Sequence, residues 1–513
     1  MTSSSSSDLI SDYMMTIPES GMAESPKPGR TRSSSASSPS PGAEKPSHID
    51  IDLEKKGSDP SGGQLPYDDE ASSKKGGEDT AVLVYPSWAY NPVGRIVYAG
   101  WQFVKEHFGE GSVGSSIFVL LSATLGAGTL AFPFAFKECG WALAIFLMAV
   151  CGLAAFYSIY LLVLCSIITG RNSYEELAHS VFGRATEIVV DISIIIFTWG
   201  STVAYMVIIG DTLPPLMELF GAGDTIMAER WFLLVFSTIF IIFPLTLLSR
   251  INSLRHTSLL GFAATAYLLV AVIADTSRRI ADHGLDSDRV SAANFSSRIF
   301  VGLPIIFYGF SSHVNIFSIY RELKTPTLAK ATQVIAGNII IAFLVYGTLG
   351  LFGYLAFLEK TDGNILENYA PENIAIQLGA LAMTISVVFY IPLNTHPCRI
   401  TIDWMITSLS KELAKVDITV RYVVETIIMD ALALLIAIAV PNVVVVFGLL
   451  GATATSLCCY VMPGLLYIKA ANLPWASKEA FLPLCLVTGG TLCGIISTVV
   501  IIFDMFEDPG QLE

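Results

Sequence analysis

Charge is scarce in this chain, and its scarcity excludes most classes of soluble protein. Only 14% of the 513 residues are charged, whereas 53% are hydrophobic and the mean hydropathy is +0.60. Soluble domains average about one charged residue in four, so this composition predicts a protein that crosses a membrane many times. The formal net charge is −14, and no cluster of Lys and Arg suggests a nucleic-acid partner.

The chain also lacks the side-chain sets that would build an enzyme or a disulfide scaffold. Its eight cysteines mostly lie inside apolar runs without the spacing of a metal site, so we interpret them as small buried residues. The seven histidines are scattered, and no paired aspartates or Ser/His set suggests catalysis within the membrane. We expect no enzyme activity and no cofactor beyond a coupling ion. The opening MTSSSSSDLI has no basic start and no sustained apolar core, so no cleavable signal peptide is expected.

The first 84 residues differ from the rest of the chain. Residues 1–84 are rich in Ser, Pro, Gly, Asp and Glu and are expected to form a disordered cytoplasmic tail. Ser-Pro and Arg-Xaa-Ser patterns there allow regulation by phosphorylation, and a plain solvated leader is the alternative. Residues 85–112 are aromatic and amphipathic but are interrupted by Arg95 and Lys105. This pattern favours a helix lying along the lipid headgroups, with a soluble helix beneath the bundle as the alternative.

Apolar runs of about 20 residues, the length of a membrane-spanning helix, then follow in series. They predict an all-α polytopic membrane domain over 113–513. Its eleven expected spans lie near 115–136, 141–168, 184–219, 230–248, 255–274, 298–320, 329–356, 374–396, 421–440, 442–468 and 480–504.

The distribution of Lys and Arg predicts the orientation of these spans. With a cytoplasmic N-terminus, the inner loops and span ends carry thirteen Lys and Arg against seven on the outer side. This excess on the cytoplasmic side is the usual pattern, and an odd number of spans then makes the C-terminus extracytoplasmic. The glycosylation sequon at Asn294 falls in a loop expected outside, which agrees, although it lies close to the sixth span.

Two of the expected spans carry features that weaken a helix. The first contains LLSATLGAGTLAFPFAFKECGW (120–141), with glycine at 126 and 128 and Pro133 beyond. Close helix packing through small residues is an alternative explanation for that span alone. The sixth span (298–320), however, has a central polar cluster that is expensive to place in lipid: Gly309, Ser311, Ser312, His313 and Asn315.

Interrupted spans five apart are typical of inverted-repeat transporters. We therefore expect two five-span repeats, about 115–274 and 298–468, with one appended span (480–504). Unwinding at 126–128 would leave N–H groups at the start of a half-helix, where the dipole favours an anion such as a carboxylate. Carbonyls near Ser122 and Leu125 would face a cation or an ammonium group. A zwitterion is the natural ligand of such a site.

Several segments resemble the amino acid/auxin permease family of the APC superfamily, which includes sodium-coupled neutral amino acid transporters and vacuolar amino acid permeases. The family's first span resembles LSATLGAGTLAFPFAFKECG, its third STVAYMVIIGDTLPPL, and its sixth-span exit FSSHVNIFSIYRELK. VPNVVVVFGLLGATATSLCCYVMPGLLYIK matches most closely, and the resemblance covers about 113–504.

The resemblance implies the leucine-transporter architecture and amino acid transport coupled to sodium or protons. Carried over residue by residue, it implies a carboxylate site at the amides of Gly126, Ala127, Gly128 and Thr129. It implies an amino-group site at the carbonyls of Gly309 to Ser311, and a side-chain pocket shaped by Tyr205, Phe307 and Phe310. A candidate sodium site would join the carbonyls of Ser122 and Leu125 to the hydroxyls of Thr384 or Ser386.

The sequence departs from the family pattern at the coupling site. Sodium-coupled members usually carry Asn where this chain has Ser122, and the Lys that some proton-coupled relatives of the wider fold place in the fifth span is absent from 259–275. The titratable groups nearest the expected pathway are His313, Asp211 and Glu322. His313 is either a proton carrier or a hydrogen-bond donor at the helix break. Asp211 and Glu322 are interpreted as gate or loop-tethering residues, with proton linkage as the alternative.

The function expected from these features is secondary active symport of an amino acid by alternating access. An amino acid sensor that signals through the N-terminal tail is the main alternative, and a passive channel is the third. The expected partners are an amino acid, a coupling proton or sodium ion and the lipid bilayer. The membrane is expected to be the plasma membrane or that of a vacuole or lysosome.

Overall fold

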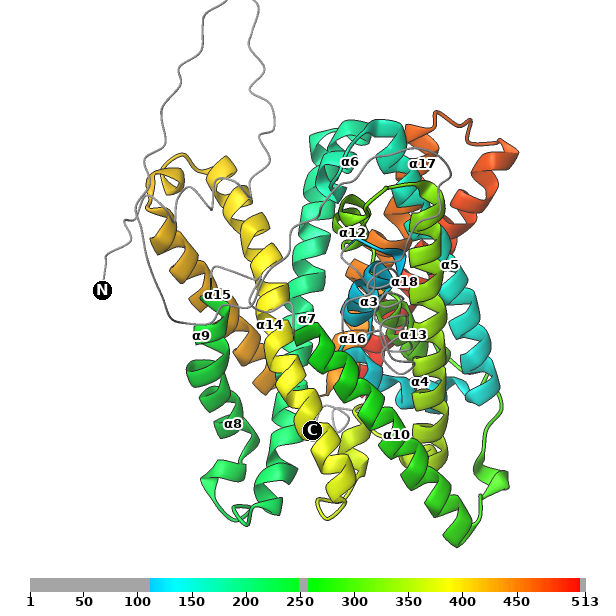
Figure 1. The fold of residues 1–513 in the computed structure, drawn as a ribbon, viewed down its shortest axis with the longest axis vertical. Coiled ribbons are helices and arrows are strands. Elements are labelled where there is room, and N and C mark those ends of the chain that lie inside the picture. Colours follow the sequence, from blue (N-terminus) through cyan, green and yellow to red (C-terminus); the bar gives the residue numbers. More distant parts are fainter. Residues whose placement is uncertain (1–110, 249–256, 441, 508–513) are drawn as a thin grey trace, which may run out of the picture. The chain divides into compact units, whose positions relative to one another are not determined.

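Helices make up all the regular structure of residues 111–248, 257–440 and 442–507, which are the residues that the computed structural model describes (Figure 1). The predicted tail (1–84) and nearly all of the predicted interfacial segment (85–112) lie outside them. The helical elements follow in this order: α3 (Val113–Thr124), η2 (Ala127–Ala131), α4 (Phe132–Cys139), α5 (Trp141–Thr169), α6 (Tyr174–Phe182), α7 (Arg184–Leu219), η3 (Ile226–Ala228), α8 (Arg230–Ser237), η4 (Thr238–Ile242), α9 (Phe243–Thr246), α10 (Thr257–His283), η6 (Ser287–Arg289), α11 (Ile299–Gly309), α12 (Ile316–Glu322), α13 (Leu328–Phe357), η7 (Leu358–Lys360), η8 (Ile365–Asn368), α14 (Ile374–Leu409), η9 (Leu413–Lys415), α15 (Ile418–Ala439), α16 (Val443–Leu450), η10 (Gly451–Val461), α17 (Met462–Ala470) and α18 (Lys478–Glu507).

Among the described residues, eight helices are long and apolar enough to cross a membrane, and α3 with η2–α4 makes a ninth candidate. Two further apolar segments are shorter than a full span, α8–α9 and α11. The eleven predicted spans are therefore not all continuous helices. The fourth predicted span is one continuous but short helix, Arg230–Thr246, which contains the π-helical turn η4, whereas a polar stretch after Gly309 interrupts the sixth.

The first predicted span is broken where its glycines lie. α3 ends at Thr124, and the chain bends by 56° before it continues as η2 and α4. Gly126 adopts an extended backbone, with φ −80° and ψ −166°, so it leaves the helix at this point. Pro133 falls in the first turn of α4, where its missing N–H removes no helical hydrogen bond. We call residues 125–131 the first break.

The sixth predicted span is broken at its polar cluster. α11 ends at Gly309 and α12 begins at Ile316, and residues 310–315 between them are not helical. This stretch holds the serines, His313 and Asn315, whose polar side chains compete with the helical backbone for hydrogen bonds. We call residues 310–315 the second break.

Contacts divide most of the helices into two groups. In the group that we call the bundle, α13 contacts α3, α4 and α5, while α11 and α12 each contact α5. In the group that we call the scaffold, α7 contacts α8, α14 and α15, and α9 contacts α14 and α15. In Figure 1 the scaffold helices α8, α9, α14 and α15 lie together on the left, and α4, α5 and α13 lie on the right. α10 contacts both groups, through α13 and α14.

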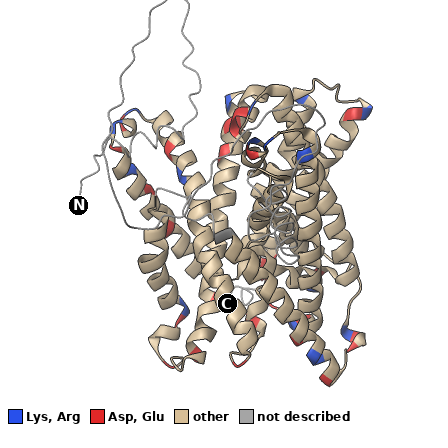
Figure 2. Cartoon of the chain, viewed as in Figure 1, with Lys and Arg blue, Asp and Glu red and all other residues tan. Residues whose placement is uncertain are grey.

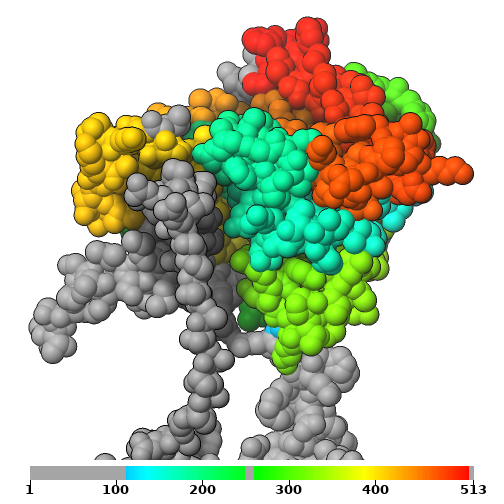
Figure 3. Space-filling model, turned by 90° about the horizontal axis from the view of Figure 1, so that it is seen from above, coloured from blue at the N-terminus to red at the C-terminus, as the bar shows by residue number. Residues whose placement is uncertain are grey.

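Charged residues gather at the two ends of the helices, and the band between them is mostly uncharged (Figure 2). This distribution is expected of helices that cross lipid, because a charge in the hydrocarbon layer is costly. The end that carries α6, α12 and α17 is the one predicted to be cytoplasmic. Seen from that end, α6 and the start of α7 lie between the end of α14 and the end of α17 (Figure 3).

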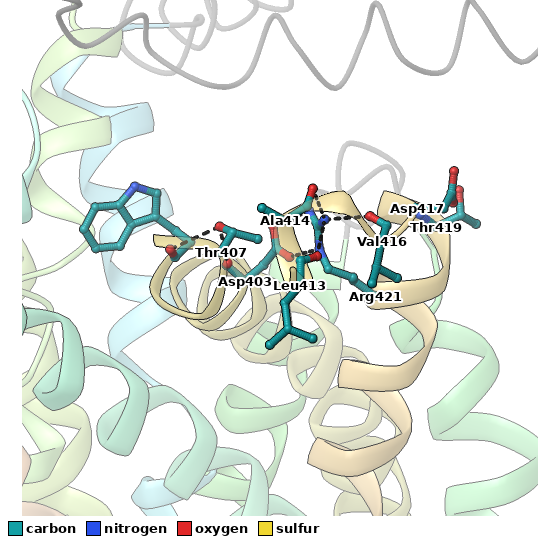
Figure 4. Close-up of polar contacts among 9 residues, drawn as sticks. Asp403, Thr407, Leu413, Ala414, Val416, Asp417, Thr419 and Arg421 are labelled. Atoms are coloured by element: carbon teal, nitrogen blue, oxygen red, sulfur yellow. Dashed lines mark hydrogen bonds and ion pairs between the residues drawn. The ribbon is translucent and has the colours of Figure 1, made fainter. Parts of the chain in front are cut away.

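At that same end, Arg421 ties α14 to α15 (Figure 4). Its Nε donates to Asp403 Oδ1 at 2.7 Å, and its Nη1 donates to the carbonyls of Leu413, Ala414 and Val416 at 3.3, 3.5 and 2.8 Å. Asp417 caps the first turn of α15 by accepting from the Thr419 N–H. One guanidinium therefore satisfies the carbonyls that a tight turn leaves without helical partners.

Candidate functional site

A cavity of about 490 Å³ lies between the two breaks, and we call it the central cavity. Among the described residues that line it, Glu322 is the single carboxylate, and there is no Lys or Arg. The cavity extends along α12 as far as Glu322, the last residue of that helix. Its lining comprises Val119, Ser122, Ala123, Thr124, Gly126, Gly128, Phe197, Ser201, Tyr205, Tyr308, Gly309, Ser311, Asn315, Ser318, Ile319, Glu322, Tyr346, Tyr390, Leu393, Asn394, His396 and Pro397.

The first break leaves backbone donors free beside this cavity. The N–H groups of Ala127 and Gly128 open the helical turn η2, so no residue within it accepts from them. No other acceptor among the described residues takes them either. The Thr129 N–H differs, because it donates to the Gly126 carbonyl at 3.1 Å, and the Thr129 hydroxyl does so at 2.7 Å. Two of the predicted carboxylate-binding amides are thus free.

The second break leaves backbone acceptors free. The Phe310 and Ser311 N–H groups donate back to Ile306 and Tyr308, but the Phe310 and Ser311 carbonyls accept no hydrogen bond among the described residues. Gly309 has no room for a side chain, since a Cβ there would lie 2.5 Å from the Phe132 ring. Donors on one break and acceptors on the other therefore border a single cavity.

One helix of the bundle holds both breaks, and the sequence analysis did not identify its residues. The Tyr346 hydroxyl on α13 lies 2.6 Å from the Thr124 carbonyl and 3.0 Å from the Gly309 carbonyl, where α3 and α11 end. On the same helix, Asn338 accepts from the Thr124 hydroxyl at 3.1 Å and donates to Ser312 at 3.3 Å. The feature of the sequence that could have identified this helix is the polar residue Asn338 inside the apolar run GNIIIAFLVYGTLG (337–350).

The aromatic lining differs from the prediction by one helical position. Tyr205 lines the central cavity as predicted, with Tyr308, which donates to Ser201 at 2.8 Å. Phe307 and Phe310 do not line it: Phe307 packs on Tyr460 with ring centroids 4.5 Å apart, and Phe310 packs edge-on against Tyr346. Successive helical residues point about 100° apart, so Tyr308 rather than its neighbour faces the cavity.

The residues predicted to hold a cation are only partly together. Ser122 lines the central cavity, and the carbonyls of Ser122 and Leu125 accept no hydrogen bond among the described residues. Thr384 and Ser386 are not in the lining. The Thr384 hydroxyl shares a hydrogen bond of 2.7 Å with Thr212, and Ser386 donates to the Ala382 carbonyl of its own helix. The α14 residues that line the cavity are Tyr390, Leu393, Asn394, His396 and Pro397.

The three titratable candidates lie in three different places. His313 is 1% exposed and shares a hydrogen bond of 2.5 Å with Ser158 on α5, while its Nδ1 has no partner among the described residues. Glu322 lines the central cavity at the end predicted to be cytoplasmic. Asp211 lies elsewhere, in a second cavity on the opposite side of the molecule.

This second cavity, which we call the vestibule, has a volume of about 770 Å³ and is rich in charge. Asp211 Oδ1 accepts from Arg230 Nε at 3.0 Å. Arg298 bridges Glu138 and Asp504 at 2.6 and 2.7 Å. Glu367, from the loop between α13 and α14, also lines it. Loss of solvent and the nearby charges of Asp211 and Asp362 raise the pKa of Glu367 to about 8.

This cavity between two helix breaks, with a single carboxylate and no Lys or Arg among its described lining residues, agrees with the family comparison. A model for transmembrane amino acid transporter proteins matches residues 109–503. The chain belongs to this family. The resemblance inferred from the sequence is thereby confirmed, and since the family consists of transporters, the chain is a multi-pass membrane protein of amino acid transport and not an enzyme.

The chain is also similar to individual transporters. Sodium-coupled neutral amino acid transporter 7 of Danio rerio is 25% identical over 420 residues, which are 79% of this chain and 90% of that relative. Vacuolar amino acid transporter 5 of Schizosaccharomyces pombe is 28% identical over 373 residues, 70% of this chain and 85% of that relative. A substrate-bound, outward-open structure of a Na⁺-coupled sialic acid symporter is 13% identical, with a TM-score of 0.45 over 77% of this chain and 92% of that one.

Proposed function

We propose that this protein is a secondary active transporter that carries an amino acid across a membrane by alternating access, coupled to a proton or sodium gradient. One observation carries the proposal. The central cavity is lined by Gly128, whose N–H is free, and by Ser311, whose carbonyl is free, and no Lys or Arg among the described residues lines it. Free donors suit a carboxylate and free carbonyls suit an ammonium group, so the cavity suits a zwitterion.

In the proposed complex, the substrate carboxylate lies at the amides of Ala127 and Gly128, and its amino group lies at the carbonyls of the second break. Tyr205 and Tyr308 surround the substrate side chain. Gly126 supports this arrangement because a Cβ there would lie 3.0 Å from the Tyr205 hydroxyl, where the backbone and the aromatic ring come close. Thr129 contributes by holding the Gly126 carbonyl rather than by contacting the substrate.

Two routes to ion coupling follow from the candidate residues. Sodium would bind at the free carbonyls of Ser122 and Leu125, completed by hydroxyls of α14 such as Thr384 or Ser386 when the scaffold moves toward α3. The name of the Danio rerio relative, a sodium-coupled transporter, favours this route. Proton coupling would use His313, Asp211 or Glu322. Of these, Glu322 is the carboxylate that shares the central cavity with the substrate.

The proposed cycle moves the bundle against the scaffold. The central cavity extends toward the predicted cytoplasmic end, so we assign the structure to an inward-facing state. In the proposed topology the eleven predicted spans include the two interrupted helices, the five-span repeats are related by inversion, and the N-terminus is cytoplasmic. The membrane is that of the cell surface or of a vacuole or lysosome. The name of the Schizosaccharomyces pombe relative, a vacuolar transporter, favours the membrane of a vacuole or lysosome.

Uptake of a panel of radiolabelled amino acids by proteoliposomes tests the proposal. A sodium gradient, a proton gradient or neither is imposed in parallel. We expect accumulation above equilibrium under one gradient and only equilibration without it. Equilibration under every condition would establish a channel, and no uptake of any amino acid would overturn the proposal.

The sensor alternative has no support in the comparisons, whose relatives are transporters. Deletion of residues 1–84 distinguishes it from a carrier in the same vesicles. A carrier retains its flux without the tail, whereas a sensor loses binding of its signalling partner.

A further inference from the structure

We propose that the carboxyl groups of Asp211 and Glu367 form a proton site in the vestibule, and that the shared proton fastens the loop between α13 and α14 onto α7. The inference deepens the transport proposal and rests on it for one of its two readouts. It concerns the control of the vestibule and holds whichever ion drives transport.

Asp211 supplies the buried half of the site. Its side chain is 7% exposed and lies on α7 at the edge of the vestibule. Oδ1 accepts from Arg230, which also donates to the Ala437 carbonyl at 3.0 Å and thereby joins α8 to α15. Oδ2 has no donor among the described residues. A buried carboxylate oxygen without a donor is unfavourable. We therefore place the shared proton at Asp211 Oδ2.

Glu367 supplies the second half from a different part of the chain. It belongs to the short helix η8, which contacts α7 of the scaffold and also η2 at the first break. It lines the vestibule together with Asp211, and the charge of Asp211 contributes to the raised pKa of Glu367. Two neighbouring carboxylates repel each other when both are ionised. One proton bound between them removes the repulsion and donates the missing hydrogen bond.

The groups around the pair favour a proton over a metal ion. Arg230 already places a positive charge against Asp211, and a second cation would be repelled by it. Lys137 is tied to the Thr361 carbonyl at 3.1 Å, at the start of the same loop. The other charged groups that line the vestibule are Asp362, Glu218, Arg298 and Asp504. The acidic members add to the repulsion that a proton relieves.

The position of the loop gives the proton its effect. With the proton bound, η8 bridges α7 and η2, that is, the scaffold and the broken span of the bundle. Without it, two negative charges face each other across this contact, and the loop is pushed from α7. Because alternating access requires these two groups to separate and close, the protonation of the pair sets how readily the vestibule closes.

Glu367→Gln is the sharpest test, because the amide keeps the shape and donates a hydrogen bond at every pH. The first readout is uptake with the pH on the vestibule side varied from about 6 to about 9.5, with the other side and the driving gradient held constant. At one unit above its pKa a group is about one-tenth protonated, so we expect wild-type uptake to fall several-fold across this range. Uptake by Glu367→Gln should not decrease with pH in this way. Uptake by the control Glu359→Gln, at an exposed position on η7, should decrease as in the wild type.

The second readout does not require transport. The raised pKa of Glu367 means that the folded state favours the protonated form, so its contribution to stability is present below the ordinary pKa and is lost as pH rises through about 8. The melting temperature of the purified wild-type protein should therefore fall across this range more than that of Glu367→Gln. Asp211→Asn should behave like Glu367→Gln, which guards against a defect peculiar to one variant.

The outcomes separate this inference from the transport proposal. Equal pH dependence of stability in wild type and Glu367→Gln would overturn the proton site even if uptake were normal. Recovery of wild-type stability at high pH on addition of sodium, without an equal gain in Glu367→Gln, would show a metal ion in place of the proton and would also overturn the inference. If no amino acid is taken up but the stability difference is found, the transport proposal fails while the proton site stands.

Discussion

The two breaks border the same cavity, but they are built in different ways. Apart from the bonds of Thr124 to Tyr346 and Asn338 on α13, the first is held by its own backbone, through the Thr129 bonds to Gly126, and by aromatic rings packed close to its glycines. The second is held by side chains that reach other helices, namely His313 to Ser158 on α5 and Ser312 to Asn338 on α13. Side-chain anchors leave the second break with free carbonyls, while glycine leaves the first with free amides.

This difference predicts how the breaks respond to substitution. At the first break, a change of side-chain size should block the ligand without unfolding the protein, since no anchor is lost. At the second, loss of an anchor should lower stability before it alters binding. The following experiments test that contrast, and their expected effects decrease from one to the next.

Gly128→Val should give the largest effect. A Cβ at this position would already lie 3.1 Å from the Tyr308 ring, and two further methyl groups would fill the space beside the free amides. We expect uptake to fall to background while expression and melting temperature stay near wild type. Gly489→Val on α18 is the matched control, since no atom lies within 4 Å of a Cβ there. Normal uptake by Gly128→Val would place the substrate elsewhere.

Tyr346→Phe removes the hydroxyl shared by both breaks, so it should affect binding and stability together. The Thr124 carbonyl keeps the Gly126 N–H as a donor, but the Gly309 carbonyl loses its donor, and a buried acceptor left without one costs about 1–3 kcal/mol. We expect a lower melting temperature and a severalfold reduction in uptake. Tyr354→Phe on the same helix is the control, because its hydroxyl accepts from Ser291 away from the cavity. If Tyr346→Phe matched this control in both measurements, the two breaks would not be coupled through α13.

Ser158→Ala should affect only the second break. His313 would then have no partner for either ring nitrogen, at a cost of about 1–2 kcal/mol. The melting temperature should fall, and the substrate concentration for half-maximal uptake should stay unchanged. Ser193→Ala, whose hydroxyl bonds only within α7, serves as the control. A change in proton coupling without a change in stability would instead assign His313 to proton transfer.

Arg421 lies far from both breaks, so Arg421→Lys should have the smallest effect. Lys is a compact ammonium and does not reproduce the planar set of bonds to Asp403 and the turn carbonyls. We expect a loss of about 0.5–1 kcal/mol in the melting measurement, because the site is partly exposed, and normal uptake. Impaired uptake in this variant would show that the α14–α15 turn takes part in the cycle.

Much of this site was predictable from local sequence. Gly126 and Gly128 in an apolar run predicted the break at which α3 ends, and the polar cluster at 309–315 predicted the second. The register of the aromatic residues was not predictable, because Tyr308 and Phe307 are both compatible with a buried span. Asn338 and Tyr346 act through bonds to residues more than twenty positions away, which no local pattern reports.

The sequence by itself determined that the chain crosses a membrane, where its helices are interrupted and which backbone groups the interruptions release, because hydropathy and glycine content act locally. Tertiary structure decided which side chains hold the breaks, which aromatic ring faces the ligand and which carboxyl groups meet in the vestibule. Those choices depend on how α7, α13 and the loop before α14 pack around the bundle. Packing brings together residues whose separation in the sequence carries no information about their contact.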